Sequence, residues 1–140
     1  MKRIIVLLLI LIAVSCGPAA DKGKKPLYEV LTQQNDGGAQ VRFFEILTEE
    51  REIKMLQNDE NLKNKVKSTD VNTANFVILN MGEKPSGGHS ISVESVRETA
   101  DKIYIKVKET GPGEGEMATS VMSYPYAIVK VNSKKEIVIE

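Results

Sequence analysis

The chain has 140 residues, with 19 basic and 19 acidic side chains, one cysteine, one histidine and no tryptophan. Because it shows neither a basic excess nor interleaved aromatic residues, the sequence lacks the features of a nucleic-acid-binding protein. A single histidine and a single cysteine are too few for a zinc site without carboxylates at ligand spacing, and the sequence contains no such cluster. We therefore expect neither a metal nor another cofactor.

The N-terminal residues have the pattern of a bacterial lipoprotein leader. Lys2 and Arg3 precede an unbroken apolar run over residues 4–14. This run suits a secretory leader, and it is shorter than the ~20 apolar residues that a transmembrane helix needs. The run leads into AVSC, which resembles a lipobox, where the cysteine thiol receives a diacylglycerol. We expect a signal peptide over residues 1–15 and lipidation at Cys16. The alternative is an ordinary signal peptide that happens to contain a cysteine.

The residues from Cys16 onward divide into a tether and one domain. Residues 16–26 are small, polar and interrupted by glycine and proline, as in a flexible linker. Residues 27–140 are enough for a single globular domain with its own core. Because Cys16 is the only cysteine, this domain cannot contain a disulfide. We expect the protein in the cell envelope, and Gly17 favours the outer membrane because many inner-membrane lipoproteins have aspartate at that position.

The first part of the domain predicts two strands and one helix. Residues 27–33 and 41–47 have strand patterns, and the sequence NDGG between them favours a turn that would pair them as a hairpin. Thr48 suits the N-cap of a helix, and the glutamates that follow place negative charge in its first turn. With apolar residues on one face, the pattern predicts a helix over residues 49–57.

The second part of the domain predicts strands only. Residues 76–81 are continuously apolar, as in a buried strand, whereas residues 102–109 alternate apolar and polar side chains, as in a half-exposed strand. Further strands are expected over residues 89–96 and 136–140, and one or two strands are expected within residues 117–131. Many short strands with one short helix indicate a mainly β (α+β) fold, a small antiparallel domain of the β-sandwich or barrel-like type.

The loop after the buried strand has the sequence GEKPSGGH and ends with the chain's only histidine. His89 has serines nearby, but the sequence contains no G-x-S-x-G elbow, and its only thiol is assigned to the lipid. The glycine patterns of phosphate-binding loops are also missing. We therefore expect no catalytic residue. Proline and glycine instead predict a tight turn that closes a hairpin, and a turn on a β scaffold can also bind a partner.

Two motifs in the second part of the domain resemble a known family. FVILNMGEKPSGGHSISVESV, followed by IYIKVKETGPGEGEMATSVMSYPYAIVKV, resembles the C-terminal domain of the protease complex subunit PrcB family, most strongly over residues 68–135. That family has G-x-K-P-[ST]-G-G-[YF]-x-I after a strand, and a late [TS]-x-P-[YF] before a final apolar strand. The first motif is matched by Gly82, Lys84, Pro85, Ser86, Gly87, Gly88 and Ile91, and the second by Pro125 and Tyr126.

The chain departs from the family pattern at two places. His89 stands where tyrosine or phenylalanine is usual, and Val71 follows Asp70 where phenylalanine often follows aspartate. Contacts made by those aromatic rings therefore do not carry over to this chain. The candidate binding residues lie in two segments: Gly82, Lys84, Pro85, Ser86, Gly87, Gly88 and His89 in the first, and Tyr124, Pro125 and Tyr126 in the second.

The resemblance implies a lipoprotein that associates with, and stabilises, a secreted or surface protease complex. We expect a non-catalytic envelope protein, held to the membrane by its N-terminal lipid, that binds another envelope or secreted protein such as a protease. One alternative is a peptidase inhibitor, because Pro85, Gly88 and His89 resemble the Pro-x-x-Gly-Tyr loop of chagasin-type inhibitors. Another is the binding of a small molecule or glycan, which the scarcity of aromatic residues disfavours.

Overall fold

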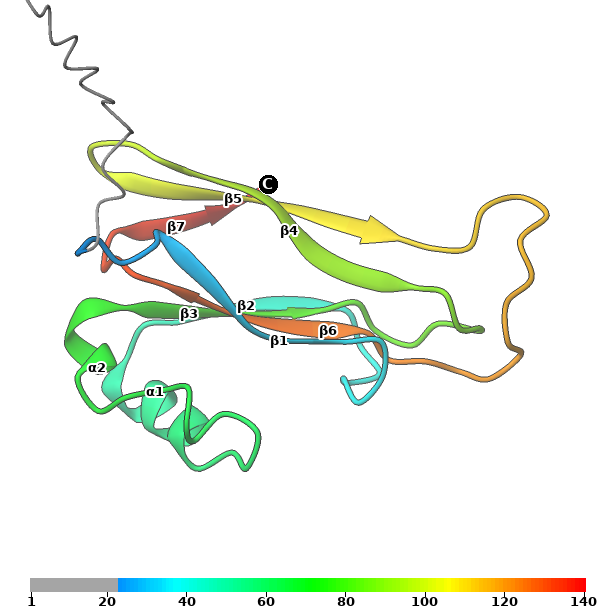
Figure 1. Ribbon diagram of the computed structural model, residues 1–140, viewed down its shortest axis with the longest axis horizontal. Coiled ribbons are helices and arrows are strands. Elements are labelled where there is room, and N and C mark those ends of the chain that lie inside the picture. The colour runs from blue at the N-terminus through cyan, green and yellow to red at the C-terminus, as the bar shows by residue number, and fades with distance from the viewer. Residues whose placement is uncertain (1–22) are drawn as a thin grey trace, which may run out of the picture.

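The computed structural model describes residues 23–140, so Cys16, the expected leader and the first part of the expected tether lie outside the described residues. Within this range, seven strands form two sheets, and two helices cover the outer face of one sheet (Figure 1). No helix within residues 23–140 is long and apolar enough to cross a membrane. The elements are β1 (Tyr28–Gln34), β2 (Phe43–Leu47), α1 (Glu50–Gln57), α2 (Asp70–Thr73), β3 (Asn75–Asn80), β4 (Ser90–Glu98), β5 (Lys102–Thr110), β6 (Tyr126–Val131) and β7 (Glu136–Ile139).

The larger sheet has the strand order β1-β6-β3-β2, and all of its neighbouring strands are antiparallel. It is the middle layer of the domain, because the helices cover one face and the second sheet covers the other (Figure 1). In β3, Val77 and Leu79 face the second sheet while Phe76 faces the helices, and all three are buried. Burial on both faces explains why this strand is apolar without alternation.

Helix α1 begins one residue later than the sequence predicts. Its N-cap is Glu49, and the Glu52 carboxylate accepts hydrogen bonds from the backbone N–H groups of Glu49 and Thr48, each at 3.0 Å. These two bonds lower the pKa of Glu52 below its ordinary value. Ile53 and Leu56 are buried against the larger sheet, so the predicted apolar face is the one that packs.

The smaller sheet has the strand order β4-β5-β7. In β5, Ile103 and Ile105 are buried toward the larger sheet, while Lys106 and Lys108 are exposed, as the alternation predicts. The core between the sheets consists of Val77, Leu79, Met81, Ile91, Ile103, Ile105, Ala127, Val129, Val131 and Ile137.

The fold is a sandwich-like pair of sheets and not a closed barrel, so the sandwich form of the prediction is confirmed. The predicted antiparallel pairing is wrong for β5 and β7, which pair in parallel. In Figure 1, β6 ends at the end of the sandwich where β5 begins, so β7 starts there too and runs beside β5 in the same direction. The prediction of one helix missed α2, whose four residues are too few to show a helical period.

Both predicted hairpins are wrong. β1 and β2 lie at opposite edges of the larger sheet, where β1 pairs with β6 and β2 pairs with β3. β3 and β4 belong to different sheets, so the loop over residues 81–89 crosses between sheets. Turn-forming residues specify a local change of direction, and this chemistry is the same whether the next strand pairs with the previous one or leaves its sheet.

Candidate functional site

Three loops meet at one end of the sandwich, on the right of Figure 1, and we call this region the loop end: residues 35–42, 81–89 and 111–125. The second and third loops are joined backbone to backbone. Lys84 and Ser123 exchange hydrogen bonds of 2.8 and 3.0 Å, and the Gly87 N–H donates to the Thr119 carbonyl at 3.0 Å. The structure therefore brings together the two segments that the sequence singled out.

Two glycines of the first motif are required by the way these loops meet. Gly82 has a φ of 81°, and a Cβ atom there would lie 2.8 Å from the backbone nitrogen of Arg42. Gly88 also has a φ of 81°, and its Cβ atom would lie 3.0 Å from the ring of Pro112. Residues other than glycine rarely adopt this backbone conformation, so both positions favour glycine even apart from the contacts. The motif therefore specifies the packing of the loop end.

Asn80 holds the remaining loop, and the sequence analysis missed it. Its side chain is 1% exposed. Its amide group donates to the carbonyls of Ala39 and Val41 at 2.9 and 2.6 Å, and its carbonyl oxygen accepts from the Ala39 N–H at 2.9 Å. A polar residue at the end of an otherwise apolar strand is the signal that could have indicated it, because buried amides need partners.

Tyr124 links all three loops. Its hydroxyl donates to the Glu83 carboxylate at 2.9 Å, its N–H donates to Asp36 Oδ1 at 3.2 Å, and its carbonyl accepts from the Gly38 N–H at 2.8 Å. The hydrogen bond to the Glu83 carboxylate raises the pKa of the Tyr124 phenol, with a smaller contribution from desolvation. Of the second candidate segment, Tyr124 is thus the residue that faces the loops.

Replacing Glu83 by glutamine should lower the pKa of Tyr124 toward its ordinary value of 10.0, because an amide carries no charge that opposes ionisation of the phenol. The folded pKa lies above the unfolded one, so this bond stabilises the fold fully below the unfolded pKa. That stability is lost as the pH rises through the folded pKa. Ultraviolet difference titration of the wild type, E83Q and Y124F measures the shift. An unchanged titration curve in E83Q would contradict it.

The other candidate residues differ in how much surface they offer. Pro125 is buried, and its carbonyl accepts from the Met81 N–H at 2.9 Å. Tyr126 begins β6 and packs on the core beneath the helices. In the first segment, the exposed residues are Pro85 and Gly88, the half-buried ones are Lys84, Ser86, Gly87 and His89, and the buried one is Gly82. Much of both motifs is therefore structural.

His89 contacts a serine, but without the third member of a hydrolase triad. Ser86 Oγ lies 3.3 Å from Nε2 of His89. Within residues 23–140, no carboxylate is hydrogen-bonded to the other ring nitrogen, whose neighbour is the backbone of Gly111. A nucleophile and a base without an orienting acid make an incomplete triad. The same residues contain no group of three or more His, Cys, Asp or Glu side chains placed to hold a metal ion.

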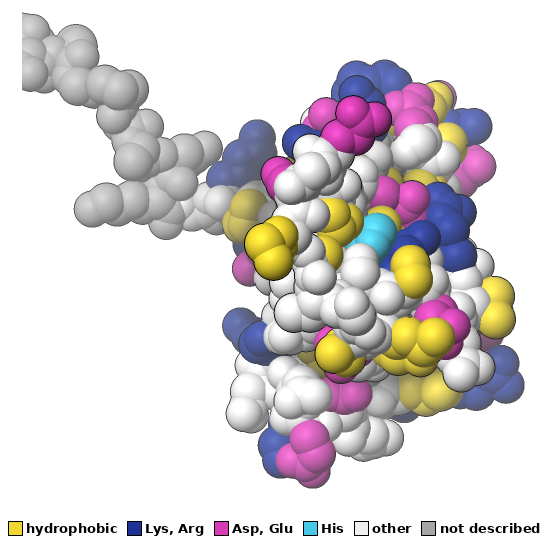
Figure 2. All heavy atoms as spheres, turned by 90° about the vertical axis from the view of Figure 1, so that its right-hand side faces the viewer, with side chains coloured by type: hydrophobic (Ala, Val, Ile, Leu, Met, Phe, Trp, Pro, Cys, Tyr) yellow, Lys and Arg dark blue, Asp and Glu magenta, His cyan; other side chains and the backbone are white. Residues whose placement is uncertain are grey.

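Apolar side chains lie exposed around these loops. Figure 2 views the loop end face on and shows several hydrophobic patches around the histidine. Among residues 23–140, seven large hydrophobic residues are exposed, and five of them belong to this end or to the strand that leaves it: Val41, Phe43, Met117, Val121 and Met122. Exposed apolar groups gathered on loops are typical of surfaces that bind other molecules. The sequence analysis did not single out these residues, although apolar residues within a glycine-rich loop are a visible signal.

A two-sheet domain whose loops are joined at one end and expose apolar side chains has the form of a β scaffold that presents loops. Residues 75–132 match the family described as PrcB C-terminal. This match confirms the resemblance that the two motifs indicate, from β3 to the residue after β6. Both motifs, and with them most of the loop end, lie inside the matched segment.

One relative is similar over part of the chain. Uncharacterized protein MJ1373 of Methanocaldococcus jannaschii is 36% identical over 57 residues, which are 41% of this chain and 34% of the relative. The chain therefore aligns with about a third of the curated relative that it matches. No solved structure matches the chain.

Proposed function

We propose that the chain is an accessory subunit of a cell-envelope complex, anchored by lipid at Cys16, that docks another protein such as a protease through its loop end. The PrcB C-terminal match supports a protease-associated accessory role. The observation that carries the proposal is the group of exposed apolar side chains on loops that are hydrogen-bonded to one another. Met117, Val121 and Met122 project from one loop at this end.

The hydrogen bonds that hold these loops in place favour binding of a partner. A partner that docks on mobile loops must order them, at a cost of ~0.5–1.5 kcal/mol for each flexible side chain and more for the backbone. Here the backbone bonds between Lys84 and Ser123, and the side chain of Asn80, already define the loop positions. Burying an exposed methionine or valine in an interface can then contribute ~1.5–3 kcal/mol.

The position of the first described residue suits a lipid anchor. The described residues begin at Gly23, at the end of the sandwich opposite the loop end (Figure 1). With a lipid on Cys16 and a short tether, this end would face the membrane and the loop end would point away from it. The proposed outer-membrane protein thus presents its apolar loops to partners in solution or in neighbouring complexes.

Photo-crosslinking in the native cells tests the proposal. A crosslinking residue at Met117 or Met122 should capture one and the same protein, whereas one at Met55, an exposed methionine on α1, should not. M122D should reduce capture from position 117 at least about tenfold, because a buried unpaired carboxylate costs more than 1.4 kcal/mol. M55D should leave capture unchanged.

Equal capture from all three positions, or capture from Met55 alone, would contradict docking at the loop end. Fractionation of the same cells tests the anchor separately. C16S should move the protein from the membrane fraction to the soluble fraction, and a variant that stays in the membrane would contradict lipidation. Capture of a protease would support the role that the family match suggests. Capture of a protein of another kind would support docking at the loop end but would contradict a protease as the partner.

A further inference from the structure

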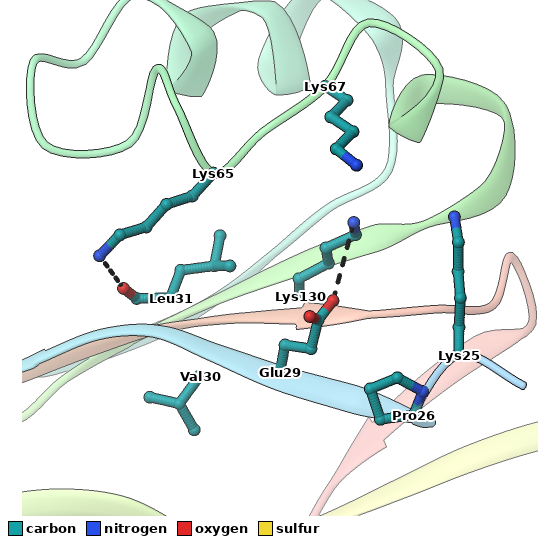
Figure 3. A pocket seen from close by; sticks show the side chains of 8 residues that line it. All are labelled: Lys25, Pro26, Glu29, Val30, Leu31, Lys65, Lys67 and Lys130. Atoms are coloured by element: carbon teal, nitrogen blue, oxygen red, sulfur yellow. Dashed lines mark hydrogen bonds and ion pairs between the residues drawn. The ribbon is translucent and has the colours of Figure 1, made fainter. Parts of the chain in front are cut away.

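A groove rich in lysine runs along the outer edge of β1, away from the loop end. It has a volume of about 390 Å³ and lies between β1 and the segment that joins α1 to α2 (Figure 3). Half of the eight residues that line it are lysines: Lys25, Lys65, Lys67 and Lys130. The chain as a whole has no net charge, so this gathering of one sign is local.

Two of the lysines already have partners. Lys130 Nζ lies 2.9 Å from the carboxylate of Asp70, which is fully buried, and 3.8 Å from that of Glu29. Lys65 Nζ donates a hydrogen bond of 2.6 Å to the carbonyl of Leu31 (Figure 3). Leu31 lies where the register between β1 and β6 shifts. The lysine therefore covers a backbone carbonyl at an irregular point of an edge strand, where it hinders pairing with another strand.

The other two lysines have no carboxylate partner among residues 23–140. Neither Lys25 nor Lys67 forms an ion pair there. In Figure 3 the ammonium group of Lys67 points from above, and that of Lys130 from below, into the same space. Among residues 23–140, the carboxylates that pair with the four groove lysines are those of Glu29 and Asp70, which leaves two positive charges without a paired carboxylate there.

The positions of these groups are determined by the fold. One Asp70 oxygen accepts the backbone N–H of Lys67 at 2.8 Å, and the other pairs with Lys130 at 2.9 Å. A single buried carboxylate thus holds the backbone of one groove lysine and the ammonium group of another. Surface lysines that repel one another normally extend into solvent. Here the bonds to Asp70 hold the backbone of Lys67 and the ammonium group of Lys130 beside the same groove.

We propose that this lysine groove binds a phosphate group. Two uncompensated ammonium groups match the charge of a phosphate, which is −1 to −2 near neutral pH, and its oxygens can accept bonds from several lysines at once. A single carboxylate would leave one positive charge unbalanced. Lysine binds phosphate as a point charge, which requires no fixed fork geometry. The proposal is independent of the docking role of the loop end.

The phosphate could belong to a soluble phosphate ester or to the headgroup of an anionic phospholipid. The groove begins at Lys25, close to where the described chain starts, so a membrane held at the N-terminal end would lie near it. The shared chemistry is the phosphate group, and the two sources differ in whether a lipid surface is needed.

The test uses the full chain, kept in micelles of an uncharged maltoside detergent and labelled for NMR. Inorganic phosphate is titrated at constant ionic strength, adjusted with chloride. The backbone amide signals of Glu29 and Lys67 should shift and saturate. The double variant K25Q/K67Q should weaken this binding at least about tenfold, because charged hydrogen bonds are lost. K108Q is the matched control, since Lys108 is also exposed and forms no ion pair with another described residue, but lies on β5.

The second arm places the same chain in bilayer discs of phosphatidylcholine, with or without phosphatidylglycerol. Shifts of the groove signals that need phosphatidylglycerol, and are smaller in K25Q/K67Q than in K108Q, would assign the site to a lipid headgroup. Shifts with inorganic phosphate alone would assign it to a soluble ester. Both replaced lysines are exposed, so the fold should persist, and dispersed amide signals verify it. No saturable shift in either arm, or equal effects in K25Q/K67Q and K108Q, would overturn the proposal.

Discussion

Replacing Asp70 by alanine should lower the free energy of unfolding by ~3–5 kcal/mol, the usual loss when one member of a buried ion pair is removed. Asp70 is fully buried, and its partner Lys130 is 6% exposed. The oxygen that faces Lys130 Nζ at 2.9 Å has no aligned hydrogen bond, so the attraction between the charges carries this contact. Without Asp70, the ammonium group of Lys130 keeps only the more distant Glu29, at 3.8 Å.

Urea unfolding of the purified protein measures this loss. The double variant D70L/K130M removes both charges and retains apolar volume, so it should be markedly more stable than D70A. K54A is a suitable control, because Lys54 is an exposed member of an ion pair on α1, and such pairs contribute ~0–1 kcal/mol. A loss below about 1 kcal/mol in D70A would show that Lys130 reaches water when it is unpaired.

Replacing Gly82 by alanine should lower the free energy of unfolding by more than ~2 kcal/mol. Two effects combine. The φ of 81° places an L-residue in a conformation that costs ~1–2 kcal/mol, and the new Cβ atom would approach the Arg42 backbone nitrogen to 2.8 Å. Backbone cannot yield as a flexible side chain does, so the loop over residues 81–89 would have to move away from the loop over residues 35–42.

Gly115 supplies the matched control for this variant. It has a φ of 78°, but nothing lies within 4 Å of the Cβ atom that alanine would add. G115A should therefore cost only the conformational part, ~1–2 kcal/mol. The difference between the two variants in urea unfolding isolates the close contact at Gly82. Equal losses would mean that the contact relaxes without cost and that the motif glycine is needed only for its conformation.

Several elements could be predicted from the sequence because their signals are local. The alternation in β5, the continuous apolar run in β3 and the apolar face of α1 each depend on residues within one segment. All three were confirmed, with no boundary shifted by more than one residue. The four residues of α2 show no period, and they were missed. The lipid anchor at Cys16 is also a local pattern, but it lies outside the described residues and stays a prediction.

The sequence located the candidate loops but not which of their residues are exposed. The motifs located the loops, but Gly82 and Pro125 proved to be buried structural residues. The exposed apolar residues, Met117 foremost, were not selected, because exposure depends on what the rest of the chain covers. The supporting bonds of Asn80 and the ion pair of Asp70 with Lys130 join residues that are distant in sequence, so no local pattern contains them.

The sequence by itself determined where strands and a helix form, because hydrophobic periodicity and turn chemistry act over a few residues, and its two motifs indicated the resemblance to the PrcB C-terminal family over residues 75–132. Only the tertiary structure decided that the loop over residues 81–89 crosses between two sheets and that β7 lies parallel to β5. It also decided that the loops meet at one end and that lysines gather along β1. These features result from burying both faces of the larger sheet, a constraint on the whole chain that no single segment expresses.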